Sequence, residues 1–262
     1  NYWGGHAGIN WDFPSWSDGT LRGGPLMWGE RRTNGRVGFF SDERKAVQVN
    51  GTYLWGRGSE SDSRSSTTTM NIRWRPSGRT SVRVGPFLSE SINDLQWVQR
   101  VRIDENDHYV FGRIDQKTVG ITGRFDFTFT PDLTLQLYAQ PFVSAGKYAD
   151  FKRVVEPRAK HYEDRIQRFE PEVAEDRYWA DLDGNGTAEN FRIPDFNVQQ
   201  FRSTAVLRWE YLPGSLLYLV WSQGRDFDDR SGELSFRDDL ENLFDQAAEN
   251  VFMVKLSYWI SP

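Results

Sequence analysis

Hydrophobic and polar positions alternate with a period of two along much of the chain. Between 119 and 130 the odd positions hold Val, Ile, Gly and three Phe, whereas the even positions hold Gly, Arg, Asp and three Thr. A β-strand places successive side chains on opposite faces, so this pattern predicts a strand with one apolar and one polar face. After the turn signal Pro131-Asp132 the alternation resumes from 133 to 143, which predicts a hairpin.

The same alternation recurs in other parts of the chain. Positions 201–211 and 217–221 flank the turn signal Pro213-Gly214, and 252–260 forms an amphipathic, aromatic-rich final stretch. Together with weaker stretches nearer the N-terminus, the pattern predicts about twelve strands. The predicted strands cover 2–13, 34–42, 46–57, 66–75, 80–90, 94–104, 108–116, 117–130, 132–146, 200–212, 215–225 and 249–260.

The connections between these strands alternate in length. Short links with turn residues follow even-numbered strands, and every long link follows an odd-numbered one. Outer-membrane barrels join their strands in this way, with short periplasmic turns and longer external loops. Strands of roughly ten residues tilted near 40° span about 25 Å, the height of the apolar band of such barrels. We therefore expect one barrel domain over 1–262, with long external loops at 14–33, 147–199 and 226–249 and both termini on the periplasmic side.

Composition supports this interpretation. Aromatic residues make up 15% of the chain, with 11 Trp and 18 Phe, although the mean hydropathy is −0.66. Outer-membrane barrels combine aromatic girdles with a polar lumen, whereas a run of about 18 apolar residues, the mark of a membrane helix, is absent from the sequence. The predicted fold class is all-β, an antiparallel up-and-down transmembrane β-barrel of about 12 strands with long external loops. A soluble β-sandwich or soluble barrel shows the same alternation and is the alternative.

Cysteine content and charge narrow the classes of function. The chain has no Cys, which excludes disulfides, thiolate zinc sites and thiol catalysis within it. Its net charge of −5 argues against nucleic acid as a partner. The first residues form no basic and apolar leader, so we expect a mature chain or the barrel-forming part of a longer protein.

Four segments resemble a known family. Together they are similar to the carboxyl-terminal barrel region of uncharacterised bacterial proteins, a domain of unknown function, whose amino-terminal part is similar to a family 9 carbohydrate-binding module. The resemblance implies a β-barrel in the bacterial outer membrane. It supplies no catalytic residues, and the binding-module region lies outside this sequence. The segments are Leu21 to Met27, Phe127 to Phe142, Val206 to Ser215 and Val251 to Trp259.

A candidate calcium loop lies inside the long connection after Lys147. Alternating oxygen-bearing side chains between glycines suit Ca²⁺, which takes six to eight hard oxygen ligands on a tightly turning backbone. The twelfth position, where an EF-hand needs a bidentate Glu, is Arg192, so a full EF-hand is excluded. An Asp/Asn/Gly turn that binds no ion is an equal alternative. The candidate ligands are Asp181, Asp183, Asn185, Thr187 and Glu189.

The polar faces of the predicted strands carry an excess of Arg. If the apolar faces meet lipid, these side chains point into the lumen. There they would line an anion-favouring pore, or neutralise one another and close it; we favour neutralisation because twelve strands enclose little space. The predicted lumen-lining residues are Arg73, Arg75, Arg83, Arg100, Arg102, Arg124, Asp126, Arg202, Arg208, Glu210 and Lys255.

Sequence motifs of known enzymes are missing, and His6, His108 and His161 lie far apart in the sequence. The leading hypothesis is therefore an outer-membrane barrel in contact with lipid, acting as a pore or as an anchor for periplasmic or surface protein partners. A structural scaffold that binds proteins without conducting is the second hypothesis, and a membrane-embedded hydrolase is the third. Two amphipathic stretches, 159–169 and 234–248, predict short helices within the loops.

Overall fold

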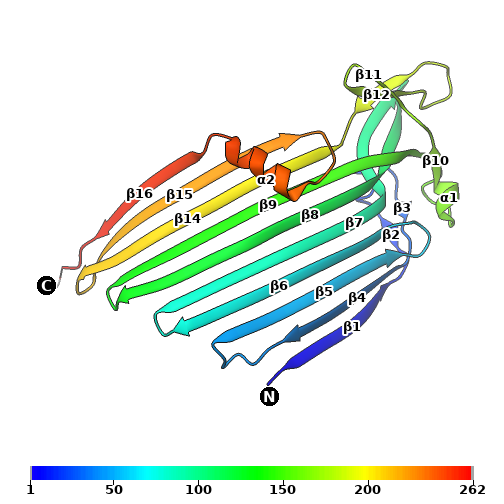
Figure 1. Ribbon diagram of the computed structural model, residues 1–262. Helices are drawn as coiled ribbons and strands as arrows, with labels where there is room; N and C mark the ends of the chain where they lie inside the picture. The colour runs from blue at the N-terminus through cyan, green and yellow to red at the C-terminus, as the bar shows by residue number, and fades with distance from the viewer. Residues whose placement is uncertain (1, 261–262) are drawn as a thin grey trace.

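The computed structural model describes residues 2–260, and most of them belong to one large antiparallel sheet. Ten long strands follow one another as a meander, and each pairs with its neighbours in chain order (Figure 1). They are β1 (Gly4–Asp12), β4 (Arg32–Phe40), β5 (Val47–Gly58), β6 (Arg64–Ser77), β7 (Thr80–Ile103), β8 (Asn106–Thr130), β9 (Leu133–Val154), β14 (Phe196–Leu212), β15 (Ser215–Asp229) and β16 (Glu249–Ser257). The predicted all-β class is confirmed. The sheet is open, because β1 and β16 each pair with one neighbour within the described chain.

The count of about twelve strands was wrong, because two pairs of predicted strands are continuous. The stretches 80–90 and 94–104 form β7, and 108–116 and 117–130 form β8. Register shifts between Asn93 and Gln96 and between Trp97 and Gln99 interrupt the alternation in β7 without ending the strand. A β-bulge has this effect, since an extra residue shifts every later side chain to the opposite face.

The two ends of the sheet differ in the lengths of their connections. At one end the links 41–46, 78–79, 131–132 and 213–214 are short. The opposite end carries the connections after β1, β5, β9 and β15, which include every long one, together with the two-residue link between β7 and β8. Figure 1 shows the start of β1 and the end of β16 at the same end of the sheet as the short links. The predicted alternation of short and long connections is therefore present. The one exception is the short link after Ile103, which lies at the end with the long connections.

The long connections fold into a small cap over the extended ends of β7, β8 and β9. Its elements are β2 (Trp16–Ser17), β3 (Met27–Trp28), α1 (Tyr162–Arg165), β10 (Ile166–Arg168), β11 (Glu172–Ala174), β12 (Arg177–Ala180) and β13 (Glu189–Arg192). Both buried apolar clusters found within residues 2–260 lie here. One joins Phe191 and Leu182 to Val110 and Phe151, and the other joins Leu21 to Phe111 and its neighbours.

The two predicted loop helices are shorter than expected. The stretch 159–169 contains the single turn of α1, and 234–248 contains α2 (Phe236–Asp245). Helix α2 lies across β9, β14 and β15 (Figure 1), with Leu243 buried and the Phe244 ring 5.1 Å from that of Phe201.

Outside the cap the sheet has one apolar and one polar face. Directly paired residues of antiparallel strands point to the same side, so the pairing register defines each face. One row of eight paired residues on eight neighbouring strands is apolar throughout. This apolar row is Val47, Trp74, Val82, Phe125, Leu137, Ala205, Trp221 and Phe252.

Candidate functional site

Three arginines form a row on the polar face. Arg73 of β6 pairs with Arg83 of β7, which pairs with Arg124 of β8. Directly opposed residues have Cα atoms about 4.5–5.5 Å apart, so three positive charges occupy adjacent positions. None of the three has an ion pair with any residue of 2–260. We call Arg73, Arg83 and Arg124 the arginine row.

The arginine row has a hydrogen-bond donor without an acceptor among the described residues. The Nε atom of Arg73 is buried and has no hydrogen-bond partner among the described residues. The guanidinium carbon of Arg124 lies 5.2 Å from the centre of the Tyr138 ring, a cation–π contact that holds the side chain against β9. Beside it is a cavity of about 110 Å³, lined by Arg124, Asp126, Tyr138, Thr204 and others.

Elsewhere on the polar face the arginines are paired with acids. Arg202 donates two hydrogen bonds to Asp226, at 2.7 and 2.9 Å, and Arg208 lies 3.0 Å from Glu210. The Lys255 ammonium lies 5.9 Å from the centre of the Tyr218 ring. On the polar face, Arg202 and Arg208 of β14 thus have acidic partners, whereas Arg73, Arg83 and Arg124 have none among the described residues.

By register, Arg100 and Arg102 point to the opposite side of the sheet from the arginine row, because they pair with odd-numbered residues of β8 whereas Arg83 pairs with Arg124. Both lie near the tip of the β7–β8 hairpin, beyond the two register shifts, at the end that carries the cap. Arg100 is paired there with Asp107 at 3.6 Å. Arg75 lies at the rim of the polar face, where its Nη2 donates to the backbone carbonyl of Glu43 at 3.0 Å.

The structure brings together three of the five candidate calcium ligands. Carboxylate oxygens of Asp181 and Asp183, in the connection after β12, and of Glu189, the first residue of β13, lie within 4.8 Å of one another. Asp181 accepts hydrogen bonds from the backbone N–H groups of Gly184 and Gly186, at 2.7 and 2.9 Å. These bonds lower the pKa of Asp181, which keeps the carboxylate charged.

The other two candidate ligands take part in the turn itself. Asn185 donates to Asp183 through Nδ2 and accepts the backbone N–H of Thr187 through Oδ1, at 2.9 and 2.7 Å. Both flanking glycines, Gly184 and Gly186, have φ of +85°, a left-handed conformation that glycine adopts without strain. The loop is therefore preformed, which suits a hard cation and also suits the alternative of a turn without an ion.

A buried charged cluster in the cap was missed in the sequence analysis. Lys152 is fully buried, and its Nζ donates to Asp94 Oδ1 at 2.9 Å and to the Asp94 carbonyl at 2.7 Å. The Tyr162 hydroxyl donates to the other carboxylate oxygen at 2.6 Å. Burial by itself would raise the pKa of Asp94, but the hydrogen bonds from Tyr162 and Lys152 outweigh it and lower the pKa.

This cluster could not be found from sequence spacing. Asp94 is 58 residues from Lys152 and 68 residues from Tyr162. A polar cavity of about 320 Å³ adjoins the cluster and is lined by Glu60, Asp62 and Arg168 among others. The cluster is distinguished from the other ion pairs of the chain by its burial. This burial depends on how the cap folds back on β9, which the sequence spacing does not show.

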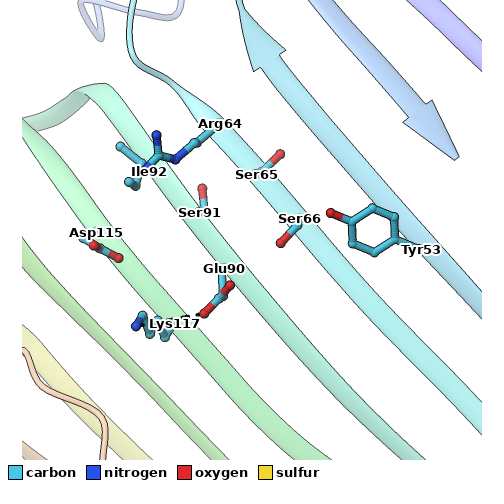
Figure 2. A pocket seen from close by; sticks show the side chains of 9 residues that line it. All are labelled: Tyr53, Arg64, Ser65, Ser66, Glu90, Ser91, Ile92, Asp115 and Lys117. Atoms are coloured by element: carbon cyan, nitrogen blue, oxygen red, sulfur yellow. Dashed lines mark ion pairs between the residues drawn. The ribbon is translucent and has the colours of Figure 1, made fainter.

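A cavity of about 410 Å³ lies toward the cap from the apolar row, and its lining side chains come from β5 to β8 (Figure 2). Glu90 and Lys117 are directly paired and lie 4.0 Å apart, joined by the dashed line in Figure 2. Arg64 and Asp115 lie one row further toward the cap. Charges of both signs therefore border the apolar side of the sheet.

Comparison with known proteins identifies one family. No helix within residues 2–260 is long and apolar enough to cross a membrane. Neither the curated proteins nor the solved structures contain a match. Residues 22–261 match the family described as the domain of unknown function DUF5916, so the resemblance to a family of unknown function is confirmed. Because the match covers nearly the whole sequence, the chain belongs to the DUF5916 family.

Proposed function

We propose that the chain forms the wall of a transmembrane β-barrel in a bacterial outer membrane. The apolar row is the observation that carries the proposal. It crosses eight neighbouring strands without a polar residue. Five of its members are exposed, among them Trp74 at 49%, Trp221 at 41% and Phe252 at 75%, and the other three are partly exposed. A sheet in water would have to cover such a surface, whereas lipid solvates it directly.

The height of the apolar surface fits a membrane. On β9 the apolar residues of this face run from Leu133 to Val143, of which Val143 is buried. On the same face Ala145 and then the charged Lys147 follow. Eleven residues at about 3.3 Å each, tilted by about 40°, give about 28 Å, close to the apolar band of such barrels. Directly above it lie Glu90 and Lys117, where charges would meet lipid headgroups.

The two free edges of the sheet are suited to closure. The meander has ten long strands, so β1 and β16 run antiparallel and can pair as neighbouring strands do elsewhere. All nine residues of β16 are exposed. Unpaired edges of this kind promote aggregation, and a closed barrel removes them. Figure 1 shows β1 and β16 at opposite margins of the open sheet.

A non-conducting anchor is a second candidate. The cap favours it, because an ordered, well-packed cap at the end with the long connections would narrow or block a lumen. The arginine row favours a pore, since unneutralised charge on the polar face would attract anions. Single-channel conductance across a planar bilayer separates the two: discrete anion-selective steps support the pore, and a folded, inserted but silent protein supports the anchor.

A matched pair of substitutions tests the membrane assignment. Leu137→Arg places a charge on the apolar face within the expected band, and Gln136→Arg places the same charge on the polar face one residue away. For protein folded in lipid vesicles, we expect Leu137→Arg to lower the free energy of unfolding by about 2–4 kcal/mol and Gln136→Arg by less than about 1 kcal/mol. Both are measured by urea titration of tryptophan fluorescence.

Two results would contradict the proposal. Equal effects of the two substitutions would mean that both faces meet water or both are buried. Unmodified protein that folds and stays soluble without detergent, with no difference in gel migration between heated and unheated samples, would exclude membrane insertion.

A further inference from the structure

The arginine row keeps an unfavourable arrangement of charges. Directly opposed like charges destabilise a sheet, yet Arg73, Arg83 and Arg124 occupy three consecutive paired positions. On the same face Arg202 and Arg208 each have an acidic partner. The chain therefore neutralises its arginines on β14 and β15 but leaves three together on β6, β7 and β8.

We propose that the arginine row binds inorganic phosphate or a phosphate group. Guanidinium groups match phosphate oxygens with pairs of parallel hydrogen bonds, and three of them can converge because their backbones are neighbours. The Nε of Arg73 is buried without a partner in the described chain and so has a hydrogen bond to give. A single carboxylate would neutralise one of the three charges, whereas a phosphate dianion neutralises two.

Asp126 gives the site a means of selecting phosphate over sulfate. It lies two residues from Arg124 on the same face and lines the same cavity of about 110 Å³, together with Thr204 and Gln136. Hydrogen phosphate carries a P–O–H group that can donate to the Asp126 carboxylate. Sulfate carries no proton at neutral pH, so its oxygens would meet the carboxylate without a hydrogen bond.

The inference rests on the proposed function for its location: on the polar face of a closed barrel, the row would form an arc of the lumen wall. Rings of Arg or Lys select anions in pores, provided that binding is weak enough for release. Binding of phosphate itself needs only the local pairing of β6, β7 and β8.

The test uses the full chain folded in detergent micelles, with inorganic phosphate as the probe and isothermal titration as the measurement. Arg83→Gln removes the central guanidinium. Arg202→Gln is the matched control, because it removes the same charge from the same face but from a residue paired with Asp226. We expect Arg83→Gln to weaken phosphate binding by about tenfold or more and Arg202→Gln by less than about twofold.

Two further variants sharpen the result. Arg83→Lys keeps the charge but loses the planar pair of donors, so we expect intermediate affinity. Asp126→Asn should remove the preference for phosphate over sulfate at equal ionic strength. Circular dichroism confirms the fold of each variant, and Arg124→Gln replaces Arg83→Gln if the latter does not fold.

The outcomes separate this inference from the proposed function. A heat-modifiable, membrane-inserted protein without saturable phosphate binding overturns the phosphate site alone. Equal losses in Arg83→Gln and Arg202→Gln also overturn it, because they indicate general charge screening. Phosphate binding lost selectively in Arg83→Gln supports the site, even if the folded protein proves soluble without detergent and the membrane assignment fails.

Discussion

Lys152 and Asp94 form a fully enclosed ion pair beneath the cap, 2.9 Å apart. Removing one partner of such a pair leaves an uncompensated buried charge, which costs far more than the pair itself contributes. We expect Asp94→Asn to destabilise the cap by about 3–5 kcal/mol in a urea titration. Asp62→Asn is the control: Asp62 is exposed and 3.7 Å from Arg113, so its loss should cost less than about 0.5 kcal/mol. Equal costs would show that burial of the pair does not matter.

The Asp94 carboxyl also predicts that the stability of the cap depends on pH. The cap lies outside the proposed membrane band. Hydrogen bonds from Tyr162 and Lys152 lower the pKa of Asp94 below its ordinary value of 3.8, against the effect of burial. Because the pKa of Asp94 is lower in the folded than in the unfolded chain, the charged carboxylate stabilises the fold above pH 3.8. This contribution is lost as the pH falls through the lowered pKa. The protection factors of the cap amides, measured by hydrogen exchange and corrected for the intrinsic pH dependence of exchange, should therefore be constant from about pH 5 to 7 and fall below about pH 4. Asp94→Asn should lack the acid step that comes from this residue.

The loop from Asp181 to Glu189 predicts an ion-binding response at the residue scale. Three carboxylates with oxygens within 4.8 Å repel one another unless a cation lies between them. We expect Ca²⁺ to bind with its affinity reduced about tenfold or more in Asp181→Asn and little changed in Asp176→Asn, a nearby acid outside the loop. Isothermal titration measures both. Unmodified protein that shows no saturable heat would establish the loop as a turn without an ion.

At the scale of elements, an aromatic cluster is one of the contacts that hold the cap. Phe191 of β13 is fully buried, with its ring 5.5 Å from those of both Phe151 and Tyr178. This contact joins the small sheet of β11, β12 and β13 to the long strand β9. Phe191→Ala should cost about 3–5 kcal/mol and expose the cap to proteolysis, whereas Val173→Ala, at an exposed position of β11, should do neither. Resistance of Phe191→Ala to protease would mean that other contacts hold the cap.

The long strands β7, β8 and β9 explain how the cap is carried. Each has more than twenty residues, about twice the length that the membrane band needs. The halves of these strands nearer the cap extend beyond the apolar face, and the long connections pack on them (Figure 1). The bulges near Asn93 and Gln99 mark this change of environment, where β7 passes from an uncovered sheet to a packed one.

For the whole molecule, closure of the sheet is the decisive prediction. The chain has no Cys, so engineered pairs give an unambiguous signal. We combine Ala7→Cys on β1 with Phe252→Cys, Val254→Cys or Leu256→Cys on β16, all on the apolar face by register. A disulfide needs Cα atoms within about 7 Å, so one pair should cross-link inside a single chain in micelles. Cross-links found exclusively between two chains would show that the edges pair between copies.

Much of the fold follows from the sequence by itself. Period-two alternation and turn dipeptides such as Pro131-Asp132 predict the all-β class, the hairpins and the two chemically different faces, because strand geometry links sequence spacing directly to side-chain direction. Alternating connection lengths predict which end carries the long loops. The spacing of Asp181, Asp183 and Glu189 likewise identifies the acidic loop, since all three lie within the short stretch 181–189.

Tertiary structure alone decided the rest. Two pairs of predicted strands are continuous in β7 and β8, and in β7 the register shifts reverse the pattern without breaking the ladder. The arginine row exists because the registers of three strands bring Arg73, Arg83 and Arg124 side by side, and register depends on every turn and bulge between them. Lys152 meets Asp94 across 58 residues of chain for the same reason. Local patterns determine which way a side chain points, whereas its neighbours and its burial depend on contacts that only the folded chain makes.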